Sequence, residues 1–335
     1  MGLGLLSGWV LRDDVGMRAV FLWVLIGFGV ASVGKAQGLR NGPMPTAVEA
    51  MGSLVGLSEV QRAAFEADPA WFERIRKPEP SDWLAAHTEP GQTVEAYRKV
   101  LAQVKPRPAQ KFLAILPLGA FGDKAPDLET LRSYCAAFFA METRVLPGVV
   151  LEKVPAKSRV NRNTQNRQLL TTDILKWLPG VKPADCYALI AVTMEDLYPD
   201  EGWNFVFGQA MLLGGGGVFS FARYDPAFYG EAAAEGDGEL MLRRSGKVLT
   251  HEMGHMFGMR HCVFYECLMN GSNHLGETDS RPMHLCPVCL RKLQLGAGFG
   301  LLSREMGLLK FYEKESFKAE ADWMRRRVMK LAGVE

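Results

Sequence analysis

The 335-residue chain lacks a strong charge of either sign, and it lacks internal repeats and low-complexity tracts. Its 39 Lys and Arg residues nearly balance its 37 Asp and Glu residues. The resulting net charge of +2 gives no electrostatic indication of nucleic acid or of anionic membranes as partners. We therefore expect no nucleic-acid partner. With 48% hydrophobic and 23% charged residues, the composition is that of an ordinary globular protein, long enough for one large domain or two smaller ones.

The apolar run at residues 19–34 is short for a membrane span. Its 16 residues would form a helix of about 24 Å, whereas the hydrocarbon core is roughly 30 Å thick. Arg18 precedes it and small residues follow up to Ala36, as is typical of a secretory signal peptide. The two aspartates before it are unusual in such a segment, and a start at Met17 would remove them. We predict that residues 1–36 are a signal peptide and that the protein is periplasmic or secreted.

Two alternatives to a cleaved signal remain open, an uncleaved anchor that holds the protein at the membrane and a buried core helix. No cysteine follows the apolar run directly, which excludes a lipoprotein anchor there. If the signal is cleaved, we expect no stable membrane association, and we expect a monomer.

The most informative stretch begins with HEMGH at residues 251–255. Residues four apart in an α-helix are separated by only about 40° around its axis, so His251 and His255 can face one metal ion. Glu252 lies about 100° from His251, beside the metal, where a general base for hydrolysis belongs. The alternative is an amphipathic helix with two surface histidines.

The third candidate ligand, His261, requires the helix to end. In a continuous helix it would point largely away from the other two histidines, so the chain must turn between His255 and His261. Gly258 can adopt the left-handed conformation that ends a helix at low cost. Three protein ligands leave one coordination position for water, which distinguishes a catalytic zinc from a closed structural one.

Four of the six cysteines follow directly, with the spacing of a four-thiolate zinc site: Cys262, Cys267, Cys286 and Cys289. Two disulfides are the alternative, which matters for an exported chain. A redox-active C-x-x-C is disfavoured because no thioredoxin-like strand and helix precede it. We predict a second, structural zinc. We interpret Cys135 and Cys186 as small buried residues, with pairing between them as the alternative.

Residues 251–261 resemble the metzincin metallopeptidases. With the four added cysteines and Met269, the chain is similar to the archaemetzincins, and to their animal-type members in particular. The resemblance covers roughly residues 80–295. It implies that three histidines hold the catalytic zinc, that Glu252 is the base, that the cysteines hold a second zinc, and that Met269 lies beneath the metal. The 16 residues between Met269 and Cys286 are one fewer than in the usual family pattern.

The predicted fold class is α/β, a metzincin-like mixed sheet with an active-site helix, a four-cysteine zinc segment and C-terminal helices. We predict strands at residues 111–117, 149–154, 187–193 and 205–207, helices at 127–145 and 172–178, and an exposed loop at 156–168. Four glycines at 214–217 lack the Lys-Ser/Thr of a phosphate-binding loop. The resemblance implies that the following segment is an edge strand that pairs with substrate: Val218, Phe219, Ser220, Phe221, Ala222 and Arg223.

The predicted domain organisation has four parts. After the signal come a helical N-terminal segment at 37–110, a catalytic domain at 111–300 and a helical extension at 301–335. Within the N-terminal segment we predict short helices near residues 57–65 and 93–104. We expect His87 to have a packing or hydrogen-bonding role.

The predicted function is that of a zinc-dependent metallopeptidase with two zincs per chain and a peptide or protein substrate. The resemblance implies aminopeptidase-like action on short peptides. The alternatives are a zinc-stabilised binding or scaffold protein without turnover, and a metallohydrolase of a non-peptide amide. An intact Glu252 argues against the scaffold, because binding alone has no use for that carboxylate.

Overall fold

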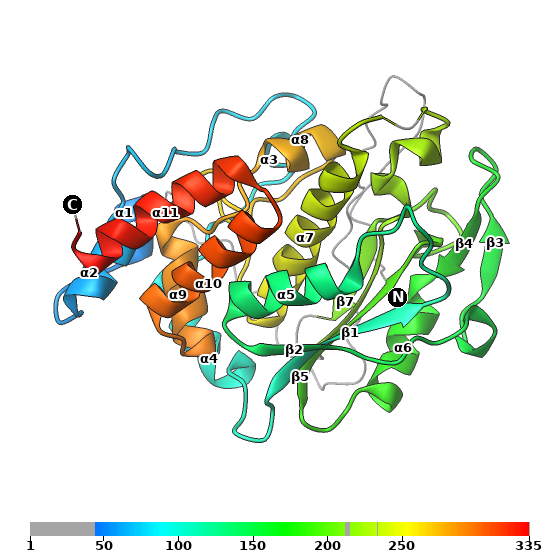
Figure 1. Ribbon diagram of the computed structural model, residues 1–335, viewed down its shortest axis with the longest axis horizontal. Helices are drawn as coiled ribbons and strands as arrows, with labels where there is room; N and C mark the ends of the chain where they lie inside the picture. Colours follow the sequence, from blue (N-terminus) through cyan, green and yellow to red (C-terminus); the bar gives the residue numbers. More distant parts are fainter. Residues whose placement is uncertain (1–43, 212–214, 233, 335) are drawn as a thin grey trace, which may run out of the picture.

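The computed structural model describes residues 44–211, 215–232 and 234–334; the predicted signal peptide lies outside them. A mixed five-stranded sheet of order β2-β1-β5-β8-β7 forms the centre of the molecule (Figure 1). Its strands are β1 (Phe112–Leu118), β2 (Glu142–Val145), β5 (Cys186–Thr193), β7 (Gly208–Met211) and β8 (Gly216–Ser220). Four strands are parallel, and β7 runs antiparallel to β8. A smaller sheet contains β3 (Ser158–Val160), β4 (Arg167–Leu170) and β6 (Asp196–Tyr198).

Helices cover both faces of the large sheet, which explains why β1 and β5 are continuously apolar and fully buried. Leu113 and Ile115 point to the face covered by α5 (Leu128–Phe139) and α7 (Asp237–Met256). Ala114 and Leu116 point to the opposite face, which α6 (Thr171–Val181) covers. The alternation along each strand thus divides the core into two layers, and α7 lies over one of them.

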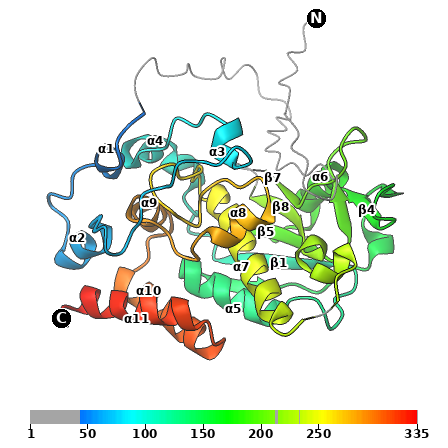
Figure 2. The same cartoon turned by 90° about the horizontal axis from the view of Figure 1, so that it is seen from above.

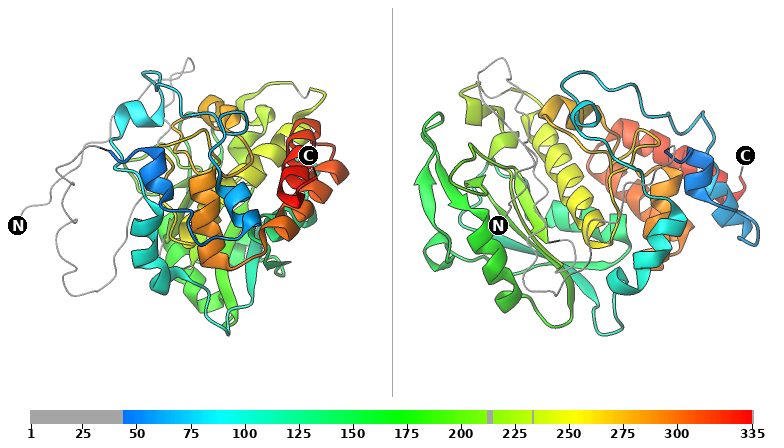
Figure 3. Two further views of the ribbon diagram at one scale, coloured as in Figure 1. Left: turned by 90° about the vertical axis from the view of Figure 1, so that its left-hand side faces the viewer. Right: turned by 180° about the vertical axis from the view of Figure 1, so that it is seen from behind.

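Most of the remaining helices gather at the end of the molecule away from β3 and β4, where the two ends of the described chain meet, whereas α3 and α8 lie nearer α7 (Figures 1 and 3). α1, α2 and α4 pack against α9, and α2 also packs against α10 and α11. The bounds are α1 (Ala47–Met51), α2 (Glu59–Phe65), α3 (Trp83–Ala86), α4 (Val94–Val104), α8 (Leu275–Ser280), α9 (Pro287–Ala297), α10 (Leu301–Lys314) and α11 (Lys318–Ala332). Among the described residues, no helix is both long and apolar enough to cross a bilayer.

The α/β class is confirmed, as are the strands beginning near residues 111 and 187 and the capped helices α2 and α4. Two predictions in the first half of the sheet were wrong. The helix predicted over 127–145 stops at Phe139, because Ala140 adopts a left-handed conformation (φ 46°), and β2 follows. The strand predicted at 149–154 is a 3₁₀ turn at Leu151–Lys153. Short apolar runs do not distinguish strand from helix by periodicity, which explains the second error.

The exposed loop predicted at 156–168 was also wrong, because it contains β3 and the start of β4. Its polar side chains are used internally: Arg159 and Asn161 both donate to the carbonyl of Asn204, the latter at 3.1 Å. The strand predicted at 205–207 is replaced by β7, which begins at Gly208; Val206 makes only an isolated bridge to Leu197.

The predicted substrate-binding strand requires a correction. Val218, Phe219 and Ser220 belong to β8, which is hydrogen-bonded to β5 on one side and to β7 on the other. An interior strand has no unpaired backbone edge for a substrate. Phe221, Ala222 and Arg223 lie beyond its end, and Arg223 is buried in an ion pair with Asp196 at 2.7 Å. Among the described strands, β7 forms this edge of the sheet.

Candidate active site and metal centres

α7 presents two histidines near its C-terminal end, and a turn brings in the third. The Nε2 atoms of His251 and His255 are 3.0 Å apart, and one ring nitrogen from each of the three histidines lies within 4.8 Å of the others. The helix ends at Met256, and Gly258 has φ +79°, which is the predicted turn that returns His261 to the cluster. Ligands of a tetrahedral zinc at Zn–N distances near 2.0 Å are about 3.3 Å apart, so the cluster has suitable dimensions for zinc.

Each imidazole is oriented through its Nδ1 atom. Nδ1 of His251 donates to the Leu268 carbonyl at 2.8 Å, and Nδ1 of His255 donates to the Met259 carbonyl at 2.6 Å. Nδ1 of His261 lies 2.6 Å from the Glu89 carboxylate. Because these oxygens accept, Nδ1 must carry the hydrogen, and a neutral ring then presents the Nε2 lone pair to a metal.

Burial keeps two of these rings neutral. It lowers the pKa of His251 to about 3, and it lowers the pKa of His255 well below the ordinary histidine range. Both imidazoles are therefore in the form that binds metal at neutral pH.

Glu252 is buried beside this cluster, with 6% of its surface exposed, and burial raises its pKa to about 8. A cation next to the carboxylate would favour its ionised form and so offset this rise. Glu252 lines an open pocket of about 460 Å³ together with His251, His261, Trp83, Lys247 and Arg281. A buried base on the wall of a pocket that also contains candidate metal ligands is an arrangement suited to hydrolysis.

Met269 lies directly beneath the helix that carries the histidines, fully buried. A Cβ atom at Gly254 would lie 2.7 Å from Met269 Sδ, so the close contact depends on a glycine in α7. Asn270, which sequence reasoning did not single out, holds the turn below: its amide donates to the carbonyls of Cys262 and Tyr265, and its oxygen accepts from the Cys267 N–H at 2.7 Å.

The four cysteines Cys262, Cys267, Cys286 and Cys289 converge in a separate, completely buried cluster. All are free thiols, and Cys262 Sγ lies 3.6 Å from Cys286 Sγ. Sulfurs around a tetrahedral zinc at about 2.3 Å are about 3.8 Å apart, so the dimensions suit a four-thiolate zinc site. Burial raises the pKa of Cys267 and Cys286 well above the usual range, and a divalent cation offsets the cost of ionising several thiols together. Cys135 and Cys186 are buried elsewhere and unpaired.

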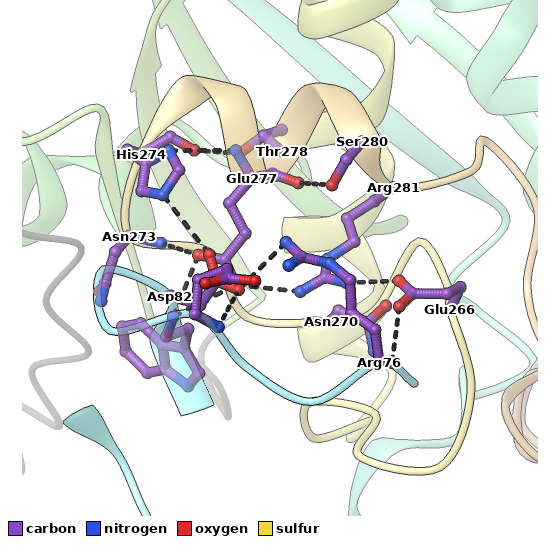
Figure 4. Close-up of polar contacts among 12 residues, drawn as sticks. Arg76, Asp82, Glu266, Asn270, Asn273, His274, Glu277, Thr278, Ser280 and Arg281 are labelled. Carbon is purple, nitrogen blue, oxygen red and sulfur yellow. Dashed lines mark hydrogen bonds and ion pairs between the residues drawn. The ribbon is translucent and has the colours of Figure 1, made fainter. Parts of the chain in front are cut away.

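A third group of possible ligands, Asp82, His274 and Glu277, has a different role (Figure 4). The Asp82 carboxylate lies 3.0 Å from the Arg76 guanidinium, and Glu277 pairs with Arg281 at 2.9 Å. Because each carboxylate already has a cationic partner, this network joins the N-terminal segment to α8 without requiring a metal.

Sequence reasoning missed the contribution of the N-terminal segment. Figure 2 shows α3 and the chain around it lying above α7 and α8. Trp83 lines the pocket, and its ring meets His261 edge-on at 5.1 Å between centroids. His87 stacks on Trp83 at 3.8 Å, which confirms its expected packing role. Glu89 gave no signal in the sequence, because it lies 172 positions from the histidine it contacts.

Comparisons with known proteins identify the family of this chain. The model of peptidase family M54 matches residues 137–295. Archaemetzincin-2 of Macaca fascicularis is 38% identical over 78% of this chain and 80% of its own length, and archaemetzincin-2 of Homo sapiens is 37% identical over the same shares. The crystal structure of archaemetzincin from Archaeoglobus fulgidus is 30% identical and covers 54% of this chain and 99% of its own, with a TM-score of 0.41. On the sequence relationship, the chain belongs to peptidase family M54, the archaemetzincins, and is a zinc metallopeptidase.

Proposed function

We propose that this metallopeptidase cleaves peptide bonds at the histidine cluster, with His251, His255 and His261 as the catalytic zinc ligands and Glu252 as the general base. The observation that supports this assignment is the convergence of three oriented imidazoles beside a buried carboxylate on the wall of an open pocket. A zinc held for stability alone would need neither the carboxylate nor the opening to solvent.

Zinc bound at this site supplies a Lewis acid that polarises the scissile carbonyl and makes water easier to deprotonate. Glu252 takes a proton from the attacking water as its oxygen adds to the carbonyl carbon. When the C–N bond breaks, Glu252 gives this proton to the leaving amine and returns to its ionised form. The two Nδ1 hydrogen bonds to the carbonyls of Leu268 and Met259 hold His251 and His255 in place throughout.

Zinc-replete protein should hydrolyse members of a mixed peptide panel, lose this activity on chelation and regain it when zinc returns. A parallel panel of non-peptide amides separates peptidase action from that of a general amidase. Turnover of the non-peptide amides alone would overturn the assignment, and so would peptide hydrolysis that persists after all zinc is removed.

We further propose aminopeptidase-like action on short peptides. His251, His261 and Glu252 share one pocket, so a short peptide bound there would reach both the candidate zinc ligands and the base. No described strand pairs with the outer edge of β7, so this edge, in place of the strand first predicted, would be the one to pair with an extended backbone. Peptides with a free N-terminal amine should be shortened from that end, while their N-acetylated forms resist. Equal internal cleavage of both forms would contradict an aminopeptidase.

We also propose a second, structural zinc held by Cys262, Cys267, Cys286 and Cys289, giving two zincs per chain. A closed set of four sulfur donors leaves no position for water or substrate, so this ion would act through stability alone. The spacing and burial of the thiols support the proposal.

Export of the protein through residues 1–36 remains a proposal drawn from their sequence. N-terminal sequencing of the protein from the exported fraction should give a mature chain that begins just after Ala36. An intact N-terminus recovered with the membrane fraction would instead support the uncleaved anchor.

A further inference from the structure

The N-terminal segment reaches the candidate zinc site at one charged residue. Glu89 Oε1 lies 2.6 Å from Nδ1 of His261, and the Glu89 side chain is only 19% exposed. The indole N–H of Trp83 donates to the same carboxylate oxygen. Glu89 is thus the one charged group among the three Nδ1 partners of the histidines. The other two partners, the carbonyls of Leu268 and Met259, are neutral.

The same segment also holds the turn that delivers the third histidine. The Gln92 amide donates to the Gly258 carbonyl at 3.0 Å, and its oxygen accepts from the Arg260 N–H at 3.0 Å. Gln92 is 5% exposed, and Lys292 donates to its side-chain oxygen at 3.1 Å. Residues 89–92 therefore contact the turn at both ends, at Gly258 and at His261.

Further upstream, the segment is anchored to the chain that follows Met269. The backbone N–H of Trp83 donates to the Glu277 carboxylate at 3.0 Å, and the side-chain amide of Asn273 donates to the carbonyl of Ser81 at 3.1 Å. Figure 4 shows this network, with Asp82 lying between His274 and Arg76. These hydrogen bonds hold the segment against the pocket and so position Glu89 beside His261.

We propose that Glu89 is a positioning residue for the catalytic zinc, acting through His261. Its carboxylate fixes the ring orientation and the tautomer that presents Nε2, and its negative charge makes the imidazole a stronger ligand for a dication. The inference rests on the zinc site proposed above. It means that the N-terminal segment is part of the catalytic centre.

The test compares Glu89→Gln with Glu89→Ala and with the control Glu95→Gln, which alters an exposed glutamate at the start of α4. Glutamine keeps the size of the side chain and one acceptor oxygen but removes the charge. Zinc affinity is measured by competition with a chromogenic chelator, and the thermal midpoint of the metal-free protein is recorded for each variant. We expect Glu89→Gln to bind the zinc of the histidine site about 10- to 100-fold more weakly, with an unchanged metal-free midpoint, and Glu95→Gln to match wild type.

The outcomes separate this inference from the proposed function. If wild type holds zinc at the histidines and Glu89→Gln binds it with equal affinity, the role assigned to the carboxylate is overturned. If only Glu89→Ala weakens binding, together with a lower metal-free midpoint, the contact is one of packing and the proposal fails. If wild type itself holds no zinc there, the proposed active site fails first. The visible spectrum of the cobalt-substituted protein gives a second readout, because a displaced His261 should alter it.

Discussion

The histidine and cysteine clusters lie within 40 residues of each other but differ in access and in donor number. Two of the three histidines, His251 and His261, line a pocket open to solvent beside a buried carboxylate, whereas all four cysteines are enclosed in the core. An open set of three suits chemistry on a substrate, and a closed set of four suits stability. The comparison shows that ligand number and burial, taken together, distinguish the two roles more clearly than either alone.

The two clusters also share one piece of chain. Cys267 belongs to the cysteine cluster, and the next residue, Leu268, accepts the Nδ1 hydrogen bond of His251. Met269 follows and packs beneath α7 at Gly254. Loss of metal from the cysteine cluster should therefore also disturb the position of His251. A substitution confined to Glu252, in contrast, should leave the cysteine cluster intact.

Loss of the cysteine cluster should have the largest effect on stability. In Cys289→Ser, we expect one zinc fewer per chain and a large fall in stability, because structural zinc contributes on the order of 10 kcal/mol to folding. Activity should fall as well, because Leu268, which positions His251, directly follows Cys267. Zinc content and thermal unfolding measure this, with Cys135→Ala as the control for a buried cysteine outside the cluster. Equal zinc content in both variants would end the structural-zinc assignment.

Loss of the base should be the next largest effect, and it should leave both metals in place. In Glu252→Gln, we expect kcat to fall by about 10²- to 10⁴-fold, because the proton of the attacking water loses its acceptor. Zinc content should match wild type. Glu239→Gln, on the same helix with a side chain that is 54% exposed, is the matched control. Retained activity in Glu252→Gln would refute the mechanism.

The methionine beneath the helix can be tested by overpacking. In Gly254→Ala, the new methyl group would meet Met269 Sδ at 2.7 Å and Met259 Cε at 2.9 Å, so we expect a loss of about 1–3 kcal/mol in the free energy of unfolding. Gly238→Ala, in the first turn of the same helix with open space around it, should be neutral or slightly stabilising. Urea denaturation of both variants compares them; equal stability would mean that the contact is not tight.

The pH dependence of kcat/KM should show the smallest effect. It should depend on the histidine cluster and Glu252 and not on the cysteine cluster. Burial raises the pKa of Glu252 to about 8, and bound zinc should lower it from that value by favouring the carboxylate. The base acts when deprotonated, so below its pKa kcat/KM should rise about tenfold per pH unit and then level off. Protonation of His251 cannot cause this limb, because burial lowers its pKa to about 3. A rate that falls between pH 5 and 7 would contradict this assignment of the base.

The sequence predicted what depends on local spacing and missed what depends on contacts far along the chain. His251, His255 and the turn at Gly258 follow from helix geometry over eleven residues, so their positions could be derived directly. Glu89 could not, because its contact with His261 arises only when the N-terminal segment folds over α8.

The sheet shows the same division. β1 and β5 were readable from their apolar runs. The edge position of β7 could not be predicted from the sequence, because strand order is a property of the whole sheet. In addition, β7 is a short strand that begins with a glycine. The correction at residues 218–223 has this origin: alternation in β8 resembled an edge strand, although both of its sides are paired.

The most direct test of the two-site account is the zinc content, measured together with peptidase activity and thiol accessibility during stepwise chelation. The account predicts two zincs per chain. The first should leave together with activity, and the second should keep its four cysteines protected from thiol reagents until the protein is denatured. A single zinc per chain with disulfides among Cys262, Cys267, Cys286 and Cys289 would contradict the closed site, and activity that survives loss of the first zinc would contradict the open one.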